Sequence, residues 1–239
     1  MSASNGRRRV GWVTNVQNDF MRPPSEGGRL YVSDLSDPSD EGAVLVKENI
    51  ERAVRWMERH CDALVYTTDW HSLEDEEIDA VDPDPARGTY PPHCMGLSDD
   101  LEMVDGAAII PSIRPEQPLV LERDADPATA DTMARHAVRD GRPVVMRKSR
   151  FDVFDGNPAA DAFVRALVEE LGGEVEFVVI GVARDVCVTQ EVESLQARDY
   201  PTVAVQDATW GLGLEDEETT LERWRRGGRV VRLEDLEVG

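Results

Sequence analysis

The segment EVEFVVIGVARDVCVTQEV, residues 174–192, carries the clearest signature of the fold. Its first part is a continuous apolar, β-branched run that ends at Gly181, which is typical of a strand buried on both faces. A helical pattern begins about four residues later, near position 185, and Cys187 falls in its first turn. A buried strand that leads directly into a helix is the repeating unit of α/β proteins.

The same alternation of strands and helices extends in both directions from this segment. Further strands are predicted at 10–16, 62–68, 119–122, 143–148, 202–208 and 229–233. Helices are predicted over about 41–60, 128–140, 158–171, 185–198 and 215–226. This order predicts an α/β protein with a three-layer, doubly wound, Rossmann-like fold and a mostly parallel central sheet. We expect one domain over residues 1–239, because no linker-like change of composition divides the chain.

The composition excludes several kinds of partner. Acidic residues outnumber basic residues by 48 to 26, and the formal net charge of -22 would repel nucleic acids and anionic membranes. No apolar run approaches the length of a membrane span, and the N-terminal residues lack the apolar core of a signal peptide, so a cytoplasmic location is expected. The three widely spaced cysteines, Cys61, Cys94 and Cys187, argue against a disulfide framework and predict reduced thiols.

Polar or reactive residues follow several of the predicted strands. Asn15, Asp69, Lys148 and Cys187 each lie at or just past a strand end. Because ligands of parallel α/β folds bind at the carboxyl ends of the strands, these four residues are expected on one edge of the sheet. A loop-rich stretch with many Asp, Pro and Gly residues extends to about position 118, and it is also a place where a site is expected.

Cys187 and Lys148 have the chemistry of a nucleophile and its charged partner. A thiol in the first turn of a helix faces unpaired backbone N–H groups and the positive end of the helix dipole, which lower its pKa, and the same N–H groups could hold an oxyanion. The alternative for Cys187 is a buried structural cysteine. Only Lys47 and Lys148 are lysines, and an amine kept at a strand end could hold the thiolate or relay protons. The alternative for Lys148 is a surface lysine.

The segment from Thr67 to Met95 contains two of the four histidines of the chain. Asp69, His71 and His93 offer one carboxylate and two imidazoles, which suit a divalent metal ion such as zinc, manganese or iron. The candidates for a fourth ligand are water and four acidic residues, Glu74, Glu76, Glu77 and Asp79. The alternative is that these side chains are hydrogen-bonded loop residues.

Five motifs occur in a fixed order: VTNVQNDF (13–20), TTDWH (67–71), YPPHC (90–94), MRKSRFDVF (146–154) and GVARDVCV (181–188). This set resembles the isochorismatase-like superfamily of cysteine hydrolases, which includes nicotinamidases and N-carbamoyl amidohydrolases. The resemblance implies that the chain cleaves a C–N bond of a small amide through a thioester intermediate. It also implies a small-molecule substrate, a homo-oligomer that is a dimer or a tetramer, and no organic cofactor.

The resemblance also assigns roles to residues near the nucleophile. It implies that Cys187 is the nucleophile, that Lys148 is its charged partner, and that the peptide between Val182 and Ala183 is cis. The N–H groups of Ala183 and Cys187 would then point at the oxyanion. By the same resemblance, three residues are metal ligands: Asp69, His71 and His93. Four aromatic residues are candidates for the pocket wall, with core packing as the alternative: Phe20, Trp70, Tyr90 and Phe151.

The chain departs from the superfamily pattern at two positions. The familiar opening is Asp-x-Gln-x-Asp-Phe, and its first Asp is the acid/base, but this chain has Asn15 there. An amide can orient a substrate but cannot accept a proton, and loss of a general acid/base typically costs about 10²- to 10⁴-fold in rate. Nicotinamidases often carry another His six residues after Asp-Trp-His, where this chain has Glu77, which is a suitable oxygen ligand.

Three functional hypotheses follow from these observations. In the first, the chain is an active cysteine amidohydrolase in which Asp69, Asp19, Lys148 or a water molecule handles the proton. In the second, it has lost hydrolysis and binds a small molecule or serves in regulation, because position 15 is Asn15. The third is enol-ether hydrolysis of the isochorismatase kind, which needs no cysteine, so the presence of Cys187 argues against it.

Overall fold

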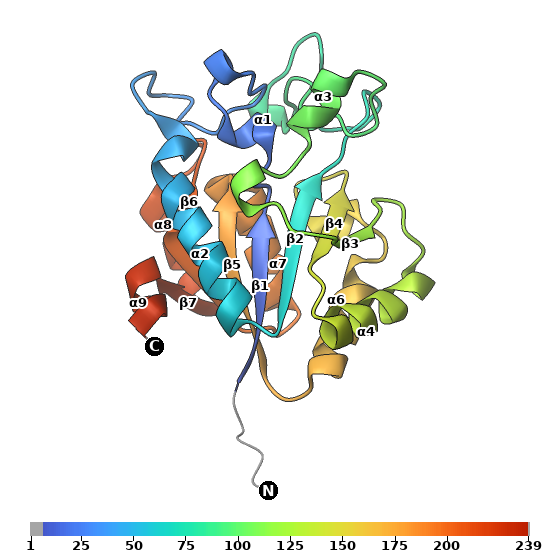
Figure 1. Ribbon diagram of the computed structural model, residues 1–239. Coiled ribbons are helices and arrows are strands. Elements are labelled where there is room, and N and C mark those ends of the chain that lie inside the picture. Colours follow the sequence, from blue (N-terminus) through green and yellow to red (C-terminus); the bar gives the residue numbers. More distant parts are fainter. Residues whose placement is uncertain (1–6, 239) are drawn as a thin grey trace, which may run out of the picture.

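A seven-stranded sheet forms the centre of the computed structural model, which describes residues 7–238 (Figure 1). The strands are β1 (Arg8–Thr14), β2 (Ala63–Asp69), β3 (Leu119–Leu121), β4 (Val144–Lys148), β5 (Val175–Val182), β6 (Thr202–Trp210) and β7 (Gly228–Val231). Their order is β3-β4-β2-β1-β5-β6-β7, and every pair of neighbours is parallel. The predicted α/β fold is confirmed, with a described sheet that is wholly rather than mostly parallel.

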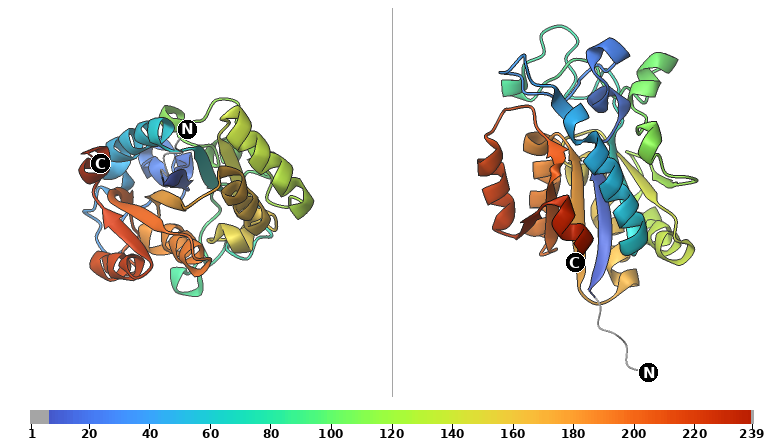
Figure 2. Two further views of the ribbon diagram at one scale, coloured as in Figure 1. Left: turned by 90° about the horizontal axis from the view of Figure 1, so that it is seen from below. Right: turned by 60° about the vertical axis from the view of Figure 1, so that its left-hand side comes forward.

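Helices cover both faces of this sheet and complete three layers (Figure 2). The helices are α1 (Asn18–Met21), α2 (Lys47–His60), α3 (Leu101–Gly106), α4 (Ala130–Asp140), α5 (Val153–Gly156), α6 (Ala160–Leu171), α7 (Thr189–Ala197), α8 (Glu217–Arg225) and α9 (Leu233–Val238). One core cluster packs α2 and α9 on the sheet, and the other packs α4, α6, α7 and α8. Successive side chains of β1 point to opposite faces, so Trp12 and Val13 lie in different clusters. Among the described helices, none has the length and apolarity of a membrane span.

Strand β1 lies where the winding of the chain reverses. From β1 the chain builds β2, β3 and β4 on one side, and it then returns to place β5, β6 and β7 on the other. All carboxyl ends point toward the short helices α1 and α3 and the loops at the top of Figure 1. Doubly wound folds bind ligands at such a reversal, which places the expected site between the carboxyl ends of β1 and β5.

Several boundaries differ from the predicted ones because the backbone changes its type there. The helix predicted over 41–60 is a 3-10 helix at Gly42–Val46 followed by α2. The helix predicted over 185–198 begins as a π-helical turn at Arg184–Val188, and α7 continues it. The strand predicted at 229–233 ends at Val231, since α9 begins two residues later.

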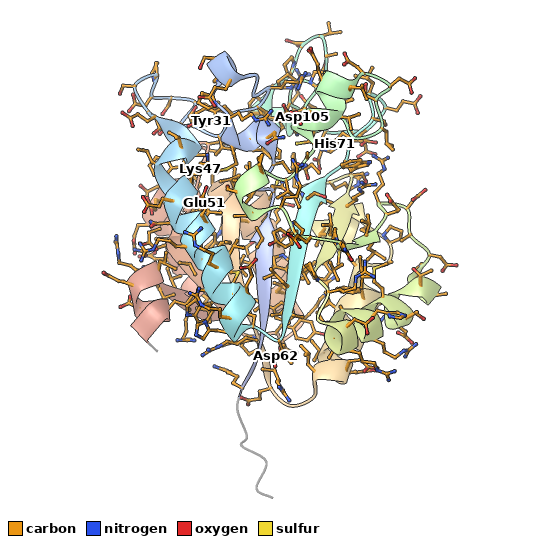
Figure 3. All side chains as sticks on the ribbon, in the orientation of Figure 1. Tyr31, Lys47, Glu51, Asp62, His71 and Asp105 are labelled. Carbon is orange, nitrogen blue, oxygen red and sulfur yellow. The ribbon has the colours of Figure 1, made fainter. Side chains whose placement is uncertain are left out.

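The two lysines of the chain have opposite environments. Lys47 is exposed at the start of α2, with Glu51 one turn further along the same helix (Figure 3). Lys148 is fully buried at the carboxyl end of β4. The surface alternative for Lys148 is therefore wrong, and a buried ammonium needs partners of opposite charge.

Candidate active site

Cys187 lies in the turn that joins β5 to α7, next to the reversal point of the sheet. The N–H groups of Val186 and Val188 both donate to the carbonyl of Ala183, at 3.1 Å each, and these bonds close the π-helical turn around the cysteine. The peptide between Val182 and Ala183 is cis. The side chain of Cys187 is nearly buried, and it lines a small cavity.

This cavity is small and has a mainly apolar wall. The lining residues are Phe20, Leu30, Val32, Asp69, Tyr90, His93, Phe151, Ala183, Val186, Cys187 and Leu212. Three of the four predicted aromatic residues are among them. Trp70 is not, because its ring stacks under the guanidinium of Arg147, at 3.5 Å, and packs against Gly96. Leu30, Val32 and Leu212 come from loops, whose sequences carry no periodic signal for burial.

The buried ammonium of Lys148 belongs to the same site. Its Nζ donates to Oδ1 of Asp69 at 2.5 Å and to the carbonyls of Arg150 and Phe151 at 3.0 and 2.9 Å. Burial lowers the pKa of Lys148, but the charge of Asp69 together with those of Cys187 and Glu191 outweighs burial, and the pKa is raised above its usual value. Lys148 therefore keeps its proton, which suits electrostatic stabilisation of a thiolate and not the relay of protons.

The pKa of the Cys187 thiol is raised, whereas the sequence predicts a lowered pKa. Burial raises the pKa of Cys187 well above its usual value, and the charge of Lys148 only partly opposes this, because Asp69 and two further acidic residues raise it again. The helix begins as a π-helical turn, so Cys187 does not occupy the first turn of a regular α-helix. The resting side chain is a thiol, and attack on a substrate requires that its proton be removed.

Asn15 lies directly after β1 and faces the same carboxylate as Lys148. Its Nδ2 donates to Oδ2 of Asp69 at 3.0 Å, while its Oδ1 is buried and has no hydrogen-bond partner among the described residues. Asp19 does not reach this group. Its carboxylate accepts hydrogen bonds from the backbone of Cys94 at 2.7 Å and from Arg29 at 3.2 Å, so it holds loops together.

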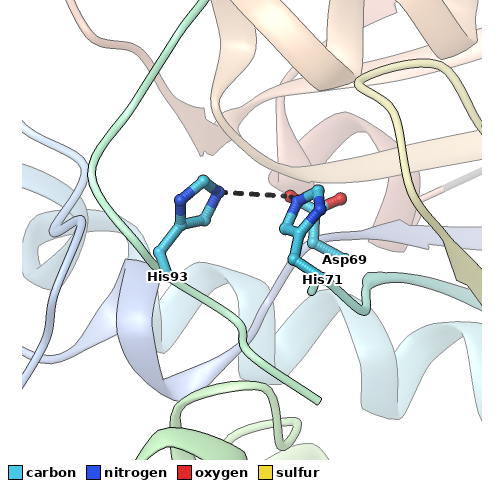
Figure 4. A group of neighbouring side chains, drawn as sticks. All are labelled: Asp69, His71 and His93. Atoms are coloured by element: carbon cyan, nitrogen blue, oxygen red, sulfur yellow. Dashed lines mark ion pairs between the residues drawn. The ribbon is translucent and has the colours of Figure 1, made fainter. Parts of the chain in front are cut away.

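Asp69, His71 and His93 come together as a buried group whose ligand atoms all lie within 4.8 Å of one another. Nε2 of His71 and Nε2 of His93 lie 3.8 and 3.9 Å from Oδ2 of Asp69 (Figure 4). Each ring is oriented through its other nitrogen, since Nδ1 of His71 contacts Asp75 at 3.0 Å and Nδ1 of His93 contacts the carbonyl of Pro91 at 2.8 Å. Nε2 of His71 is buried without a hydrogen-bond partner in the described chain, which fits a divalent ion bound there.

The two histidines of this group have opposite pKa shifts. Burial lowers the pKa of His71, but the carboxylates of Asp69 and Asp75 outweigh burial and raise the pKa to about 9. Burial and the charge of His71 lower the pKa of His93 to about 4. In the absence of a metal ion, His71 is therefore protonated and positively charged at neutral pH, whereas His93 is neutral. A bound ion would displace that proton, because a ligating imidazole must be neutral.

Of the four acidic candidates for a fourth ligand, Glu77 alone is buried. Its Oε1 accepts the N–H of Phe151 at 2.7 Å, and its Oε2 has no partner among the described residues. Glu76 pairs with Arg150 at the surface, at 2.8 Å. Asp79 accepts backbone N–H groups of its own turn, and Glu74 is exposed.

Two residues of the site carry no sequence signal that separates them from surface acids. Asp75 orients His71 and also forms two hydrogen bonds with Arg123, at 2.6 and 2.9 Å. Glu191 is fully buried on α7, and its Oε1 lies 4.0 Å from Nζ of Lys148. Its position four residues after Cys187 is the only pattern that could have marked it, because side chains at that spacing share a helix face.

The parallel sheet, with Cys187 and the buried Lys148 at the carboxyl ends of its strands, fits the isochorismatase-like class. The chain belongs to the isochorismatase family, because the model of the isochorismatase domain matches residues 13–235. None of the curated proteins compared with the chain matches it significantly.

Solved structures of amide hydrolases have the same fold. A nicotinamidase from Bacillus subtilis is 16% identical with a TM-score of 0.63, and the match covers 94% of this chain and 99% of that one. An N-carbamoylsarcosine amidase from Thermoplasma acidophilum is 21% identical with a TM-score of 0.62, over 95% and 96% of the two chains. A pyrazinamidase from Pyrococcus horikoshii, solved in complex with zinc, is 20% identical with a TM-score of 0.58, over 94% and 99%.

Proposed function

We propose that the chain is a cysteine amidohydrolase that cleaves a C–N bond of a small amide, as nicotinamidases do. The observation that carries this proposal is the shared cavity of Cys187 and Asp69, the carboxylate that holds the buried ammonium of Lys148. A thiol, a cation and a carboxylate at one enclosed point are the parts that nucleophilic attack on an amide requires. The mainly apolar wall favours a small, flat, uncharged amide.

In the proposed reaction, Sγ of Cys187 attacks the amide carbon and the thiol proton moves to a nearby acceptor. The N–H groups of Ala183 and Cys187 would hold the oxyanion, and Lys148 would stabilise the thiolate. The proton then passes to the leaving nitrogen, ammonia or an amine departs, and water hydrolyses the thioester to a carboxylic acid. Asp69 is the acceptor that the geometry favours. Burial raises its pKa, but Lys148 and the two histidines together outweigh burial and lower it, so slow turnover is expected.

A divalent ion held by Asp69, His71 and His93 would supply a Lewis acid that orients a polar group of the substrate. Zinc, manganese and iron all suit this donor set, and water or Glu77 would complete it.

We further propose that the chain acts as a single domain over 1–239, in the cytoplasm, as a homo-oligomer without an organic cofactor.

Ammonia release from a panel of small amides, beginning with nicotinamide and pyrazinamide, tests the proposal. Cys187→Ser should lower kcat by about 10³-fold or more, because a hydroxyl is a far weaker nucleophile at neutral pH. The matched control is Cys61→Ser, since Cys61 lies at the far end of α2, outside the cavity lining, and should keep full activity. Equal activity of wild type and Cys187→Ser on every amide would refute the proposal.

Asn15 favours a second candidate, a family member that binds a small molecule without hydrolysing it. The Asn15→Asp substitution separates the two candidates, because it restores a proton acceptor beside Asp69. A damaged amidase should gain about tenfold or more in kcat, whereas a binding protein should bind its ligand and gain nothing. Asn18→Asp is the control, since Asn18 is also a buried amide but its Nδ2 donates to the carbonyl of Asp105.

A further inference from the structure

Glu191 is a buried acidic residue that lies one helical turn beyond Cys187. No part of its side chain reaches solvent, and a charge in such a place is costly unless partners hold it. Burial raises the pKa of Glu191 to about 7, while Lys148 and hydrogen bonds from Trp12 and Thr14 keep it from rising further.

The two carboxylate oxygens of Glu191 have different surroundings. Oε2 accepts hydrogen bonds from Nε1 of Trp12 at 2.8 Å and from the hydroxyls of Thr14 and Thr67 at 2.7 and 2.9 Å. These donors lie on β1, which ends just before Asn15, and on β2, which ends at Asp69. One oxygen of Glu191 therefore holds the helix after Cys187 against both strands. Oε1 has no hydrogen-bond partner among the described residues and lies 4.0 Å from Nζ of Lys148.

The ammonium of Lys148 has no N–H left for Glu191. Its three donors are used by Asp69 and by the carbonyls of Arg150 and Phe151, so Glu191 acts on it through charge alone. We propose that Glu191 is a positioning residue: it is the second counter-ion of Lys148, it limits how much of the ammonium charge acts on the sulfur of Cys187, and it holds the cysteine's helix against β1 and β2.

Beside burial, four charged groups shift the pKa of Cys187: Lys148 from β4 lowers it, while Asp69 from β2, Glu77 from the loop after β2, and Glu191 from α7 raise it. Lys148 is the cation of this set, and the other three are acids. Removal of the charge of Glu191 must therefore make the surroundings of the sulfur more positive.

Alkylation of Cys187 by two reagents tests this at pH 8.5, where the Glu191 carboxyl is ionised. Iodoacetate is an anion and iodoacetamide is neutral, so the ratio of their rates reports the electrostatic potential at the sulfur. The exposure of the sulfur and its thiolate fraction affect both rates equally and do not change the ratio. Mass spectrometry of the Cys187 peptide gives both rates. Glu191→Gln keeps the shape and removes the charge, so the ratio should rise about threefold. Glu191→Asp keeps the charge and should stay near the wild type.

Glu176→Gln is the matched control. Glu176 is also a buried carboxylate of the sheet, but it binds Arg7 and Arg9 at the opposite, amino-terminal edge, so its loss should leave the ratio unchanged. An unchanged ratio in Glu191→Gln would overturn the proposal, and so would an equal change in Glu191→Asp, because that variant keeps the charge. If Glu191→Gln does not fold, Glu191→Met removes the same charge with a side chain of similar length, and the ratio should rise by a similar factor.

A role of Glu191 in turnover rests on the proposed amide hydrolysis. There, Glu191→Gln should lower kcat about tenfold and leave KM within about twofold, because it weakens the hydrogen bonds that hold the helix of Cys187 against β1 and β2 and does not alter the cavity wall. A changed alkylation ratio in a protein that hydrolyses no amide would refute the hydrolysis and support the role of Glu191. An unchanged ratio together with normal turnover would overturn that role and leave the hydrolysis standing.

Discussion

At the scale of single residues, the candidate site depends on the carboxylate of Asp69. Its Oδ1 accepts a hydrogen bond from Lys148, and its Oδ2 accepts one from Asn15 at 3.0 Å. An aspartate at position 15 would place a second carboxylate at that distance, and one of the two would have to be protonated or balanced by a cation. The amide of Asn15 therefore stabilises an ionised Asp69, at the cost of one proton acceptor.

Asp75 provides a test of the metal site that leaves all three ligands in place. Asp75→Asn removes the charge that orients Nδ1 of His71, and loss of such a partner typically weakens metal affinity by about 10- to 100-fold. Competition with a zinc chelator measures the affinity. Asp79→Asn in the same loop is the control, because the carboxylate of Asp79 accepts hydrogen bonds from its own turn and should leave the affinity unchanged. Equal affinities of the two variants would show that His71 binds no metal ion.

The buried carboxyl of Glu191 predicts a pH dependence of stability. Burial raises its pKa from 4.5 in the unfolded chain to about 7 in the folded protein, so the unfolded state ionises first as the pH rises. Wild type should therefore lose about 3 kcal/mol relative to Glu191→Gln between pH 4.5 and pH 7.5. Urea unfolding of both proteins at pH 4.5, 6 and 8 gives the difference in free energy. A difference that does not vary with pH would contradict the raised pKa.

Sequence patterns predict the proximity of the candidate site residues but not the residues that hold them in place. Cys187, Lys148 and Asp69 follow strands, and the carboxyl ends of parallel strands meet at one edge, so their proximity could be predicted. Asp75 and Glu191 could not be, because a chain with 48 acidic residues offers no contrast between a buried acid and a solvated one. Their partners come from segments far away along the sequence.

At the scale of elements, the close approach of β1 and β5 brings Asn15 and Cys187 to one place. Thr14 pairs with Gly181, and a Cβ at position 181 would lie 2.0 Å from the carbonyl oxygen of Thr14. Gly181 also has a φ of +131°, which side chains of L-residues rarely allow. The apolar run in the sequence predicts β5 but not this contact, since register between strands is a tertiary property. The π-helical turn after β5 likewise has no local sequence signature.

Gly181→Ala should therefore cost at least about 4 kcal/mol of unfolding free energy, and both the steric contact and the backbone contribute. Gly141→Ala is the matched control, because Gly141 also has a positive φ, of +60°, in the left-handed helical region, but an added Cβ would meet no atom within 4 Å. Its cost should be about 1–2 kcal/mol, the backbone part alone. Denaturant unfolding measures both variants. Similar losses in the two would mean that β1 can move away from β5 at little cost.

At the scale of the whole molecule, the charge balance opposes the compact state. Acidic residues exceed basic residues by 22, so that many acids would remain even if every lysine and arginine balanced one acid. Like charges on a folded surface lie closer together than in the unfolded chain, so their mutual repulsion favours unfolding. The individual surface ion pairs contribute little to stability and do not offset this repulsion.

Salt should therefore stabilise this protein. The screening length falls from about 30 Å at 0.01 M to about 3 Å at 1 M NaCl, so repulsion is lost while the buried Lys148–Asp69 pair is hardly affected. We expect the Tm to rise by about 5 °C over this range, measured by circular dichroism.

The triple variant Asp99→Lys/Glu102→Lys/Glu116→Lys alters three exposed acids. Each change adds two positive charges to the net charge, which moves from -22 to -16. Its Tm should respond less to salt, because less repulsion remains to be screened. A Tm that falls with salt in the wild type would instead show that attractive ion pairs dominate the surface electrostatics.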